Sequence, residues 1–178
     1  MDLVGKKVCV LGLARSGAAA ANLLHTCGAS VCVSDIKPVE KLAEYIALLE
    51  SPEIQVSANA DQIKDVSNSD LVVLSPGIPD TVPPVKAARK KGIPVISEIE
   101  LAYQNSPAPM VAITGSNGKT TTTTWTYEMF KSAWKKGPVA VAGNIGYPLS
   151  AAVRNMTAQG VVIAEISSLQ LETITSFR

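Results

Sequence analysis

Short apolar segments rich in β-branched residues alternate along this chain with segments rich in Ala and Leu. The first half predicts strands at 8–11, 30–34, 54–57, 71–75 and 94–97, and helices at 16–27, 40–50 and 83–91. Such alternation is typical of a parallel sheet whose two faces are both covered by helices. We therefore predict an α/β fold.

A polar, proline-containing stretch at 104–109 interrupts this pattern, which then starts again. The second half predicts strands at 110–114, 139–142 and 161–166 and a helix at 119–133. We expect a domain boundary at the interruption, giving domains of residues 1–105 and 106–178. The second has few strands for a nucleotide-binding sheet, so we expect it to be a truncated domain.

Charge and cysteine content exclude several classes of protein. The 16 Lys and Arg residues nearly balance the 15 Asp and Glu residues, which leaves no electrostatic footprint for nucleic acid. Three cysteines without CxxC spacing, with His25 as the one histidine, predict neither disulfides nor a zinc site. The N-terminus does not resemble a signal peptide, and no apolar run approaches ~20 residues. We expect a cytoplasmic protein without membrane insertion.

The most specific motif is a glycine turn between the strand at 110–114 and the following helix. Gly115 and Gly118 allow close backbone approach, and the exposed N–H groups at the helix start form a nest for anions. Lys119 can reach the β- and γ-phosphates of a nucleotide, and Thr120 can coordinate Mg²⁺. The generic phosphate loop has a glycine where this chain has Ile113, so this loop is a shortened form.

A second glycine turn, Gly12 to Gly17, follows the first strand and approximates the dinucleotide-binding fingerprint of a Rossmann-like domain. Asp35, at the end of the next strand, stands where such folds place an acid near a ribose. Two interpretations remain open: an NAD site, which Ala14 weakens by crowding the pyrophosphate, and a site for a uridine diphosphate. Ser75-Pro-Gly77 ends another strand at the same carboxyl edge and can contact the same ligand.

Polar residues also follow the strands of the second half. Asn144, in Gly143-Asn-Ile-Gly146, follows the strand at 139–142, and Glu165 ends a buried apolar strand. A carboxylate at a strand end beside a phosphate loop is a suitable partner for Mg²⁺. Gln170 adds a polar side chain just beyond it.

Taken in order, these motifs resemble the ATP-dependent Mur ligases, and among them the D-glutamate-adding branch. The resemblance covers the whole chain, and its most discriminating strings are Ser75-Pro-Gly-Ile-Pro79 and Glu165-Ile-Ser-Ser-Leu-Gln-Leu-Glu172. The other strings that carry it are Gly12–Gly17, Asp35, Ser97-Glu-Ile-Glu-Leu101, Thr114-Gly-Ser-Asn-Gly-Lys-Thr-Thr121 and Gly143-Asn-Ile-Gly146.

The resemblance implies a role for each matching position. The diphosphate of a UDP-linked substrate is expected at Leu13, Ala14, Arg15, Ser16 and Gly17, its uracil at Asp35, Ile36 and Lys37, and further contacts at Ser75, Pro76 and Gly77. ATP is expected to bind at Gly115, Ser116, Asn117, Gly118, Lys119, Thr120 and Thr121. Mg²⁺ is expected at Thr120 and Glu165. The acyl end of the substrate is expected near Asn144 and Gln170. Lys119, Asn144 and Glu165 are the implied catalytic residues.

The implied activity is that of an acid–D-amino-acid ligase of peptidoglycan precursor synthesis. The substrates are then UDP-N-acetylmuramoyl-L-alanine, ATP and D-glutamate, the cofactor is Mg²⁺, and the protein is a monomer. Family members are longer and bind the amino acid with a further domain, so we expect this chain to be inactive alone. The alternatives are an NAD-binding module and a non-catalytic nucleotide-binding paralogue.

Overall fold

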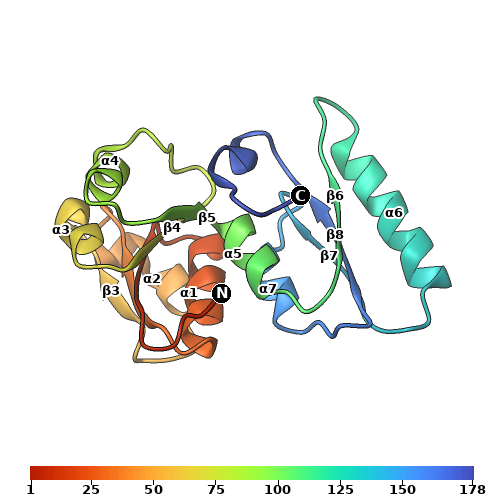
Figure 1. Cartoon of the computed structure of the whole chain (residues 1–178), viewed down its shortest axis with the longest axis horizontal. Helices are drawn as coiled ribbons and strands as arrows, with labels where there is room; N and C mark the ends of the chain where they lie inside the picture. Colours follow the sequence, from red (N-terminus) through yellow and green to blue (C-terminus); the bar gives the residue numbers. More distant parts are fainter.

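A computed structural model describes all residues, 1–178, as two parallel sheets standing side by side (Figure 1). The first sheet has five strands in the order β3-β2-β1-β4-β5, all parallel. Their bounds are β1 Lys7–Leu11, β2 Ser30–Ser34, β3 Gln55–Ser57, β4 Leu71–Leu74 and β5 Val95–Ser97. The chain order reverses next to β1, the place where open α/β sheets bind ligands at their carboxyl edge.

Helices cover both faces of this sheet, because alternate residues of each strand point to opposite sides. Val8 and Val10 of β1 pack in the larger core, whereas Cys9 and Leu11 pack in a smaller one beneath α3 and α4. The helices are α1 Arg15–Thr26, α2 Ala43–Ile46, α3 Gln62–Ser67, α4 Pro83–Lys90 and α5 Glu98–Asn105, with a 3-10 turn η1 at Val39–Lys41. No helix of the structure combines the length and apolarity needed to cross a membrane.

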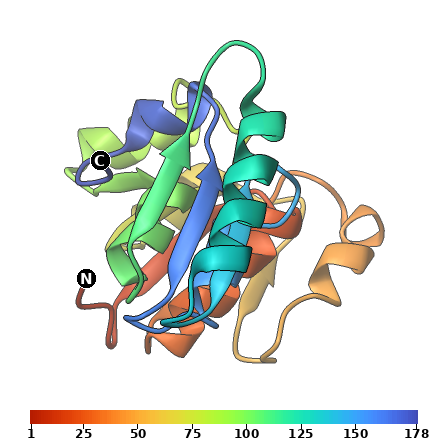
Figure 2. The same ribbon diagram turned by 90° about the vertical axis from the view of Figure 1, so that its right-hand side faces the viewer.

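The second sheet has three parallel strands in the order β6-β8-β7. Its elements are β6 Met110–Ile113, α6 Lys119–Ala133, β7 Val139–Gly143, α7 Leu149–Val153, β8 Val161–Glu165 and the 3-10 turn η2 Leu169–Thr173. Figure 2 shows the long helix α6 lying over the outer face of this sheet, with the first sheet behind it. The central strand β8 is buried along its whole length.

The two sheets share one hydrophobic core. Helix α7 packs against α1 and α5, and the larger core runs without interruption from Val10 and Leu24 to Leu149 and Val162. A T-shaped aromatic pair, Tyr103 and Phe177, joins α5 to the C-terminal segment with ring centroids 5.1 Å apart. A bidentate ion pair adds to this contact: Arg154, the C-cap of α7, donates to both carboxylate oxygens of Glu50 at 2.6 Å.

The predicted α/β class is confirmed, with a Rossmann-like first sheet and an incomplete P-loop-type second sheet. All the strands and the helices at 16–27, 83–91 and 119–133 are found within one or two residues of their predicted bounds. The helix predicted at 40–50 is wrong, since this segment forms only η1 and the single turn α2. Helices α3, α5 and α7 were not predicted; they are short, and a pattern of five to eight residues carries little periodic signal.

Candidate functional site

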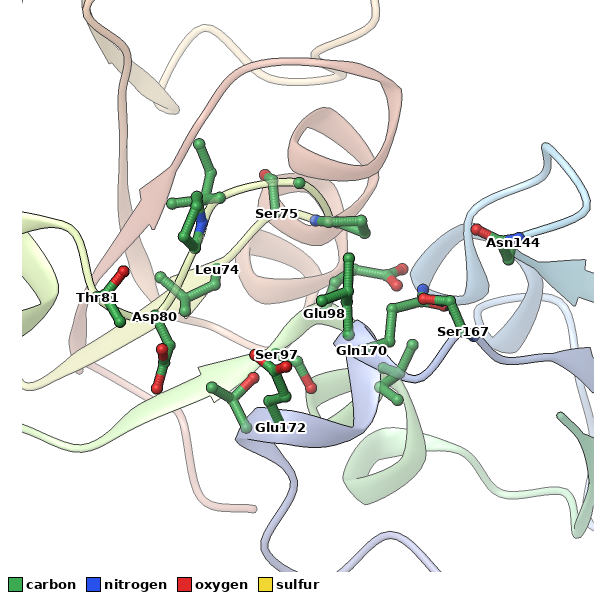
Figure 3. Close-up of a pocket in the computed structure, with 17 residues that line it drawn as sticks. Leu74, Ser75, Asp80, Thr81, Ser97, Glu98, Asn144, Ser167, Gln170 and Glu172 are labelled. Atoms are coloured by element: carbon green, nitrogen blue, oxygen red, sulfur yellow. Dashed lines mark hydrogen bonds between the residues drawn. The ribbon is translucent and has the colours of Figure 1, made fainter. Parts of the chain in front are cut away.

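A cavity of about 440 Å³ lies where the carboxyl ends of the two sheets face each other (Figure 3). Its first wall is the turn after β4, Leu74–Thr81, together with the start of α5. Its second wall is formed by Asn144, after β7, and by the segment 167–173 after β8. Five of the predicted substrate-binding residues line the cavity: Ser75, Pro76, Gly77, Asn144 and Gln170. The two glycine turns lie outside its lining.

In the first glycine turn, the backbone of Gly12 lies unusually close to Gly17, near the start of α1. A Cβ atom on Gly17 would stand 2.1 Å from the carbonyl oxygen of Gly12 and 2.8 Å from Ser75 Oγ. Gly12 itself has φ +88°, in the left-handed region that favours glycine. The hydroxyl of Ser75 donates to the same Gly12 carbonyl at 2.7 Å. Ser75 therefore ties the turn after β4 to the turn after β1.

The start of α1 has the properties of an anion-binding helix terminus. The first helical hydrogen bond comes from the N–H of Ala18, so the N–H groups of Arg15, Ser16 and Gly17 have no partner within the chain. The N-cap Ala14 offers no side-chain acceptor, and the first turn contains no acidic residue. This positive helix end is thus free to meet a diphosphate.

Asp35 is buried and holds the same turn in shape. Its Oδ2 accepts a hydrogen bond from the N–H of Leu13 at 2.8 Å, and its Oδ1 accepts one from the N–H of Lys37 at 2.9 Å. The side chains of Ile36 and Lys37 are exposed beside it. Asp35 thus shapes this edge of the sheet, and Ile36 and Lys37 offer the accessible surface there. The predicted contact of Asp35 with the uracil stays a prediction.

The phosphate loop joins β6 to α6 with its backbone turned outward. Gly115 has φ +150° and Gly118, the N-cap of α6, has φ +75°. From Gly115 to Thr121 no backbone N–H donates to an atom of the chain. Lys119 Nζ donates to the carbonyl oxygens of Gly115 at 2.6 Å and of Ser116 at 3.4 Å. The ammonium group is thus at the mouth of the loop, beside a row of free donors.

Glu165 stands at the end of the central strand β8, between the two loops of the second sheet. In register it faces Ile113, which leads into the phosphate loop, and Gly143, which leads to Asn144. Its carboxylate is buried: Oε1 accepts from Asn144 Nδ2 at 2.9 Å, whereas Oε2 has no hydrogen-bond partner. A buried carboxylate oxygen without a donor is costly unless a cation meets it. This environment fits Mg²⁺, with Glu165 as one ligand.

One carboxylate does not make a complete metal site. No group of three or more His, Cys, Asp or Glu side chains in the structure is arranged to hold an ion. A site built on Glu165 needs oxygen donors from a hydroxyl, water or phosphate, which are the partners Mg²⁺ accepts. Thr120, at the start of α6, carries a hydroxyl of this kind.

Gln170 is mostly buried on the cavity wall. Its Oε1 accepts from the N–H of Ser167 at 2.9 Å and from Ser167 Oγ at 3.0 Å. The amide nitrogen is thereby left as the donor end. Figure 3 shows Gln170, Ser167 and Asn144 on one side of the cavity, opposite Ser75.

Sequence reasoning gave Glu98 no role of its own, although it lines the cavity. Its side chain is 1% exposed, and burial raises the pKa of its carboxyl group, an effect that hydrogen bonds from Ser150 and Leu149 oppose. The string Ser97-Glu-Ile-Glu-Leu101 was a signal for this position, but nothing in it distinguishes a buried glutamate from a solvated helix start.

Comparison with known proteins agrees with this geometry. Residues 6–97 match the family model of the Mur ligase MurD-like N-terminal domain, and residues 113–177 match that of the Mur ligase middle domain. Among curated relatives, the UDP-N-acetylmuramoylalanine--D-glutamate ligase of Enterococcus hirae is 47% identical over 97% of this chain. The ligase of the same name from Koribacter versatilis is 46% identical over the full 178 residues. The chain spans 38–39% of the length of these relatives.

Solved structures share the fold at lower identity. UDP-N-acetylmuramate-alanine ligase from Thermotoga maritima superposes with a TM-score of 0.55 at 23% identity, covering 91% of this chain and 37% of its own. UDP-N-acetylmuramate:L-alanyl-gamma-D-glutamyl-meso-diaminopimelate ligase from Neisseria meningitides superposes with a TM-score of 0.56 at 20% identity, covering 91% of this chain and 52% of its own. The family models, together with the two sheets and their strand-end motifs, establish that the chain belongs to the Mur ligase family and carries its MurD-like N-terminal and middle-domain sequences.

Proposed function

We propose that the protein to which this chain belongs joins D-glutamate to UDP-N-acetylmuramoyl-L-alanine with consumption of ATP, in peptidoglycan precursor synthesis in the cytoplasm. The observation that carries the proposal is the meeting of two strand-end binding edges around one cavity. One edge supplies a helix terminus for a diphosphate, and the other supplies a phosphate loop with a buried carboxylate. Relatives that share nearly half of the sequence carry this activity in their names.

We assign UDP-substrate binding to residues 1–105 and the opening part of the ATP-binding domain to residues 106–178. Free N–H groups at Arg15, Ser16 and Gly17 receive the diphosphate, and the exposed Ile36 and Lys37 lie along the uracil. The muramoyl-alanine end then extends past Ser75 toward Asn144 and Gln170, in the cavity. An elongated substrate would thus cross the cavity from the wall that carries Ser75 to the wall that carries Asn144 and Gln170.

The reaction of the family is amide formation through an acyl phosphate. The γ-phosphoryl group of ATP moves to the alanyl carboxylate, and the amine of D-glutamate then displaces phosphate. Lys119 and the free N–H groups of the loop neutralise and orient the phosphates. Glu165 and Thr120 would hold Mg²⁺, which would supply further positive charge beside the phosphates. Asn144 holds Glu165 through its Oε1 and leaves Oε2 for the cation.

Binding measurements on the 178-residue chain test the proposal. We expect calorimetric titration with UDP-N-acetylmuramoyl-L-alanine to show saturable binding, and ATP binding to require Mg²⁺. NADH, titrated in parallel, is expected to give no response. Tight NADH binding with no response to the UDP substrate would overturn the proposal in favour of a dinucleotide-binding module. Binding without any phosphoryl transfer in the full-length protein would favour a non-catalytic paralogue.

A further inference from the structure

Two buried carboxylates project from α5, the helix that follows the last strand of the first sheet. Glu98 and Glu100 are 1% and 0% exposed, and neither forms an ion pair. Buried carboxylates without a cationic partner are rare, because the loss of hydration must be offset by hydrogen-bond donors. In both cases the donors come mainly from the part of the chain that forms the second sheet.

Glu98 holds the segment that follows Asn144. Its Oε1 accepts a hydrogen bond from the N–H of Ser150 at 2.7 Å, in the first turn of α7. The loop 144–148 leads directly from β7 into this turn and carries Asn144. Glu98 lines one wall of the cavity and Asn144 the other, so this contact ties the first wall to the segment that leads on from Asn144.

Glu100 holds the segment that follows Gln170. Its carboxylate accepts from the N–H groups of Thr175, Ser176 and Phe177, each at 3.0 Å, and from Thr175 Oγ1 at 2.8 Å. The hydroxyl of Ser176 and the amide of Gln104 add two short hydrogen bonds. Burial raises the pKa of this carboxyl group, but the donors outweigh burial and lower it to about 2. Glu100 is therefore ionised and fully surrounded by donors.

We propose that Glu98 and Glu100 are positioning residues, which set Asn144 and Gln170 at a fixed place across the cavity from Ser75. We call the pair the two-carboxylate clasp. The inference rests on the proposed function for what the cavity binds, and on the hydrogen bonds for how the walls are held. Each glutamate accepts hydrogen bonds from backbone N–H groups further along the same segment: Ser150 is six residues after Asn144, and Thr175 is five residues after Gln170. Both glutamates belong to the helix that starts at the cavity.

The arrangement is more specific than general packing between the two sheets. Apolar contacts of α7 with α1 and α5 already hold the two sheets together. These contacts are not directional, so they do not fix the positions of the loops that carry Asn144 and Gln170. Carboxylate contacts are directional and strong, because each donor must point at a charged oxygen. The clasp therefore affects the part of a ligand that reaches the second sheet, and has little effect on the part bound at α1 alone.

The test uses the 178-residue chain with the variants Glu98→Gln and Glu100→Gln. Glu128→Gln is the control, because Glu128 is an exposed glutamate on α6. Amide hydrogen exchange should accelerate about tenfold or more at Ser150 in the first variant and at Thr175 and Phe177 in the second. The control should leave these rates unchanged.

Ligand binding then separates positioning from simple stabilisation. Affinity for UDP alone should stay within about twofold of wild type in both variants. Affinity for UDP-N-acetylmuramoyl-L-alanine should fall about tenfold, which corresponds to about 1.4 kcal/mol. Glu100→Asp keeps the charge and should recover part of this loss; it also replaces Glu100→Gln as the test if that variant does not fold.

The outcomes that overturn the inference are distinct. Unchanged exchange in both glutamine variants shows that the clasp does not hold these segments. Faster exchange with an unchanged ratio of the two affinities shows that the clasp stabilises the fold without positioning the site. If the wild type binds the UDP-sugar no better than UDP, the proposed substrate is wrong, and the exchange rates alone then uphold or reject the clasp.

Discussion

Replacing Gly17 with alanine should damage the first glycine turn more than the small size of a methyl group suggests. The added Cβ would stand 2.1 Å from the Gly12 carbonyl oxygen, far inside van der Waals contact, and 2.8 Å from Ser75 Oγ. The Gly12 oxygen is a backbone atom and cannot rotate away. The turn must therefore move away from α1, and the hydrogen bond of Ser75 to Gly12 is lost with it.

The expected cost follows from three contributions. Overpacking costs about 1–3 kcal/mol, and the lost hydrogen bond about 1 kcal/mol. Alanine recovers up to about 1 kcal/mol through its higher helix propensity. The net loss in the free energy of unfolding is about 2 kcal/mol, or a fall of about 1 M in the urea midpoint at a slope of about 2 kcal/mol/M. Because the free N–H groups of α1 shift too, affinity for UDP should fall at least about tenfold.

Urea denaturation of Gly17→Ala, Ser75→Ala and the double variant decides whether this reasoning is correct. Removing the Ser75 hydroxyl leaves the 2.1 Å contact with the Gly12 carbonyl in place. The double variant should therefore be no more stable than Gly17→Ala alone. Restored stability in the double variant, or a Gly17→Ala protein with the wild-type midpoint and UDP affinity, would refute the close approach as the reason for glycine here.

Three further predictions concern the second sheet and the clasp. Lys119→Met should weaken ATP binding at least about tenfold. UDP affinity and the melting temperature should stay unchanged, since Lys119 Nζ contacts only carbonyl oxygens of its own loop. A large drop in melting temperature would contradict this. Glu165→Gln should change the free energy of unfolding by less than about 1 kcal/mol, because Oε2 has no hydrogen-bond donor to lose. The same variant should lower Mg²⁺-dependent ATP affinity, measured by titration with and without the metal, at least about tenfold. Unaltered metal dependence would exclude Glu165 as a ligand. Because the pKa of Glu100 falls from 4.5 in the unfolded chain to about 2 in the fold, its stabilisation is present above pH 4.5 and is lost toward pH 2. The difference in unfolding free energy between wild type and Glu100→Gln should therefore shrink, by up to about 3 kcal/mol, as urea denaturation is repeated from pH 6 downward, and a difference independent of pH would contradict this.

The strands and both glycine turns could be predicted from the sequence because their signals are local. A buried parallel strand appears in the sequence as a continuous apolar run, as in Val161 to Glu165, and a glycine turn is recognised by the glycines themselves. Local signals also explain the wrong prediction of a helix at 40–50. This segment has helix-forming residues, but Pro38 precedes it and Ser51-Pro52 follows it, and the structure forms only single turns there.

The contacts that shape the site are long-range and left no local signal. The sequence predicts a ligand contact for Asp35, which stays a prediction, but it gives no sign that the two oxygens of Asp35 accept hydrogen bonds from the N–H groups of Leu13 and Lys37. The donors of Glu100 lie 75 to 77 residues further along the chain. No pattern within a window of sequence can indicate such a pairing, because it depends on how α5 and the C-terminal segment meet.

The uninterrupted core beneath α1, α5 and α7 has a thermodynamic consequence. Elements that share one core unfold together, so a ligand that binds only the first sheet also protects the second from unfolding. If the first sheet binds UDP as proposed, UDP at a hundred times its dissociation constant would add about 2.7 kcal/mol to that shared stability. The phosphate loop of the second sheet would then spend more of its time in the folded form, which is the form proposed to bind ATP.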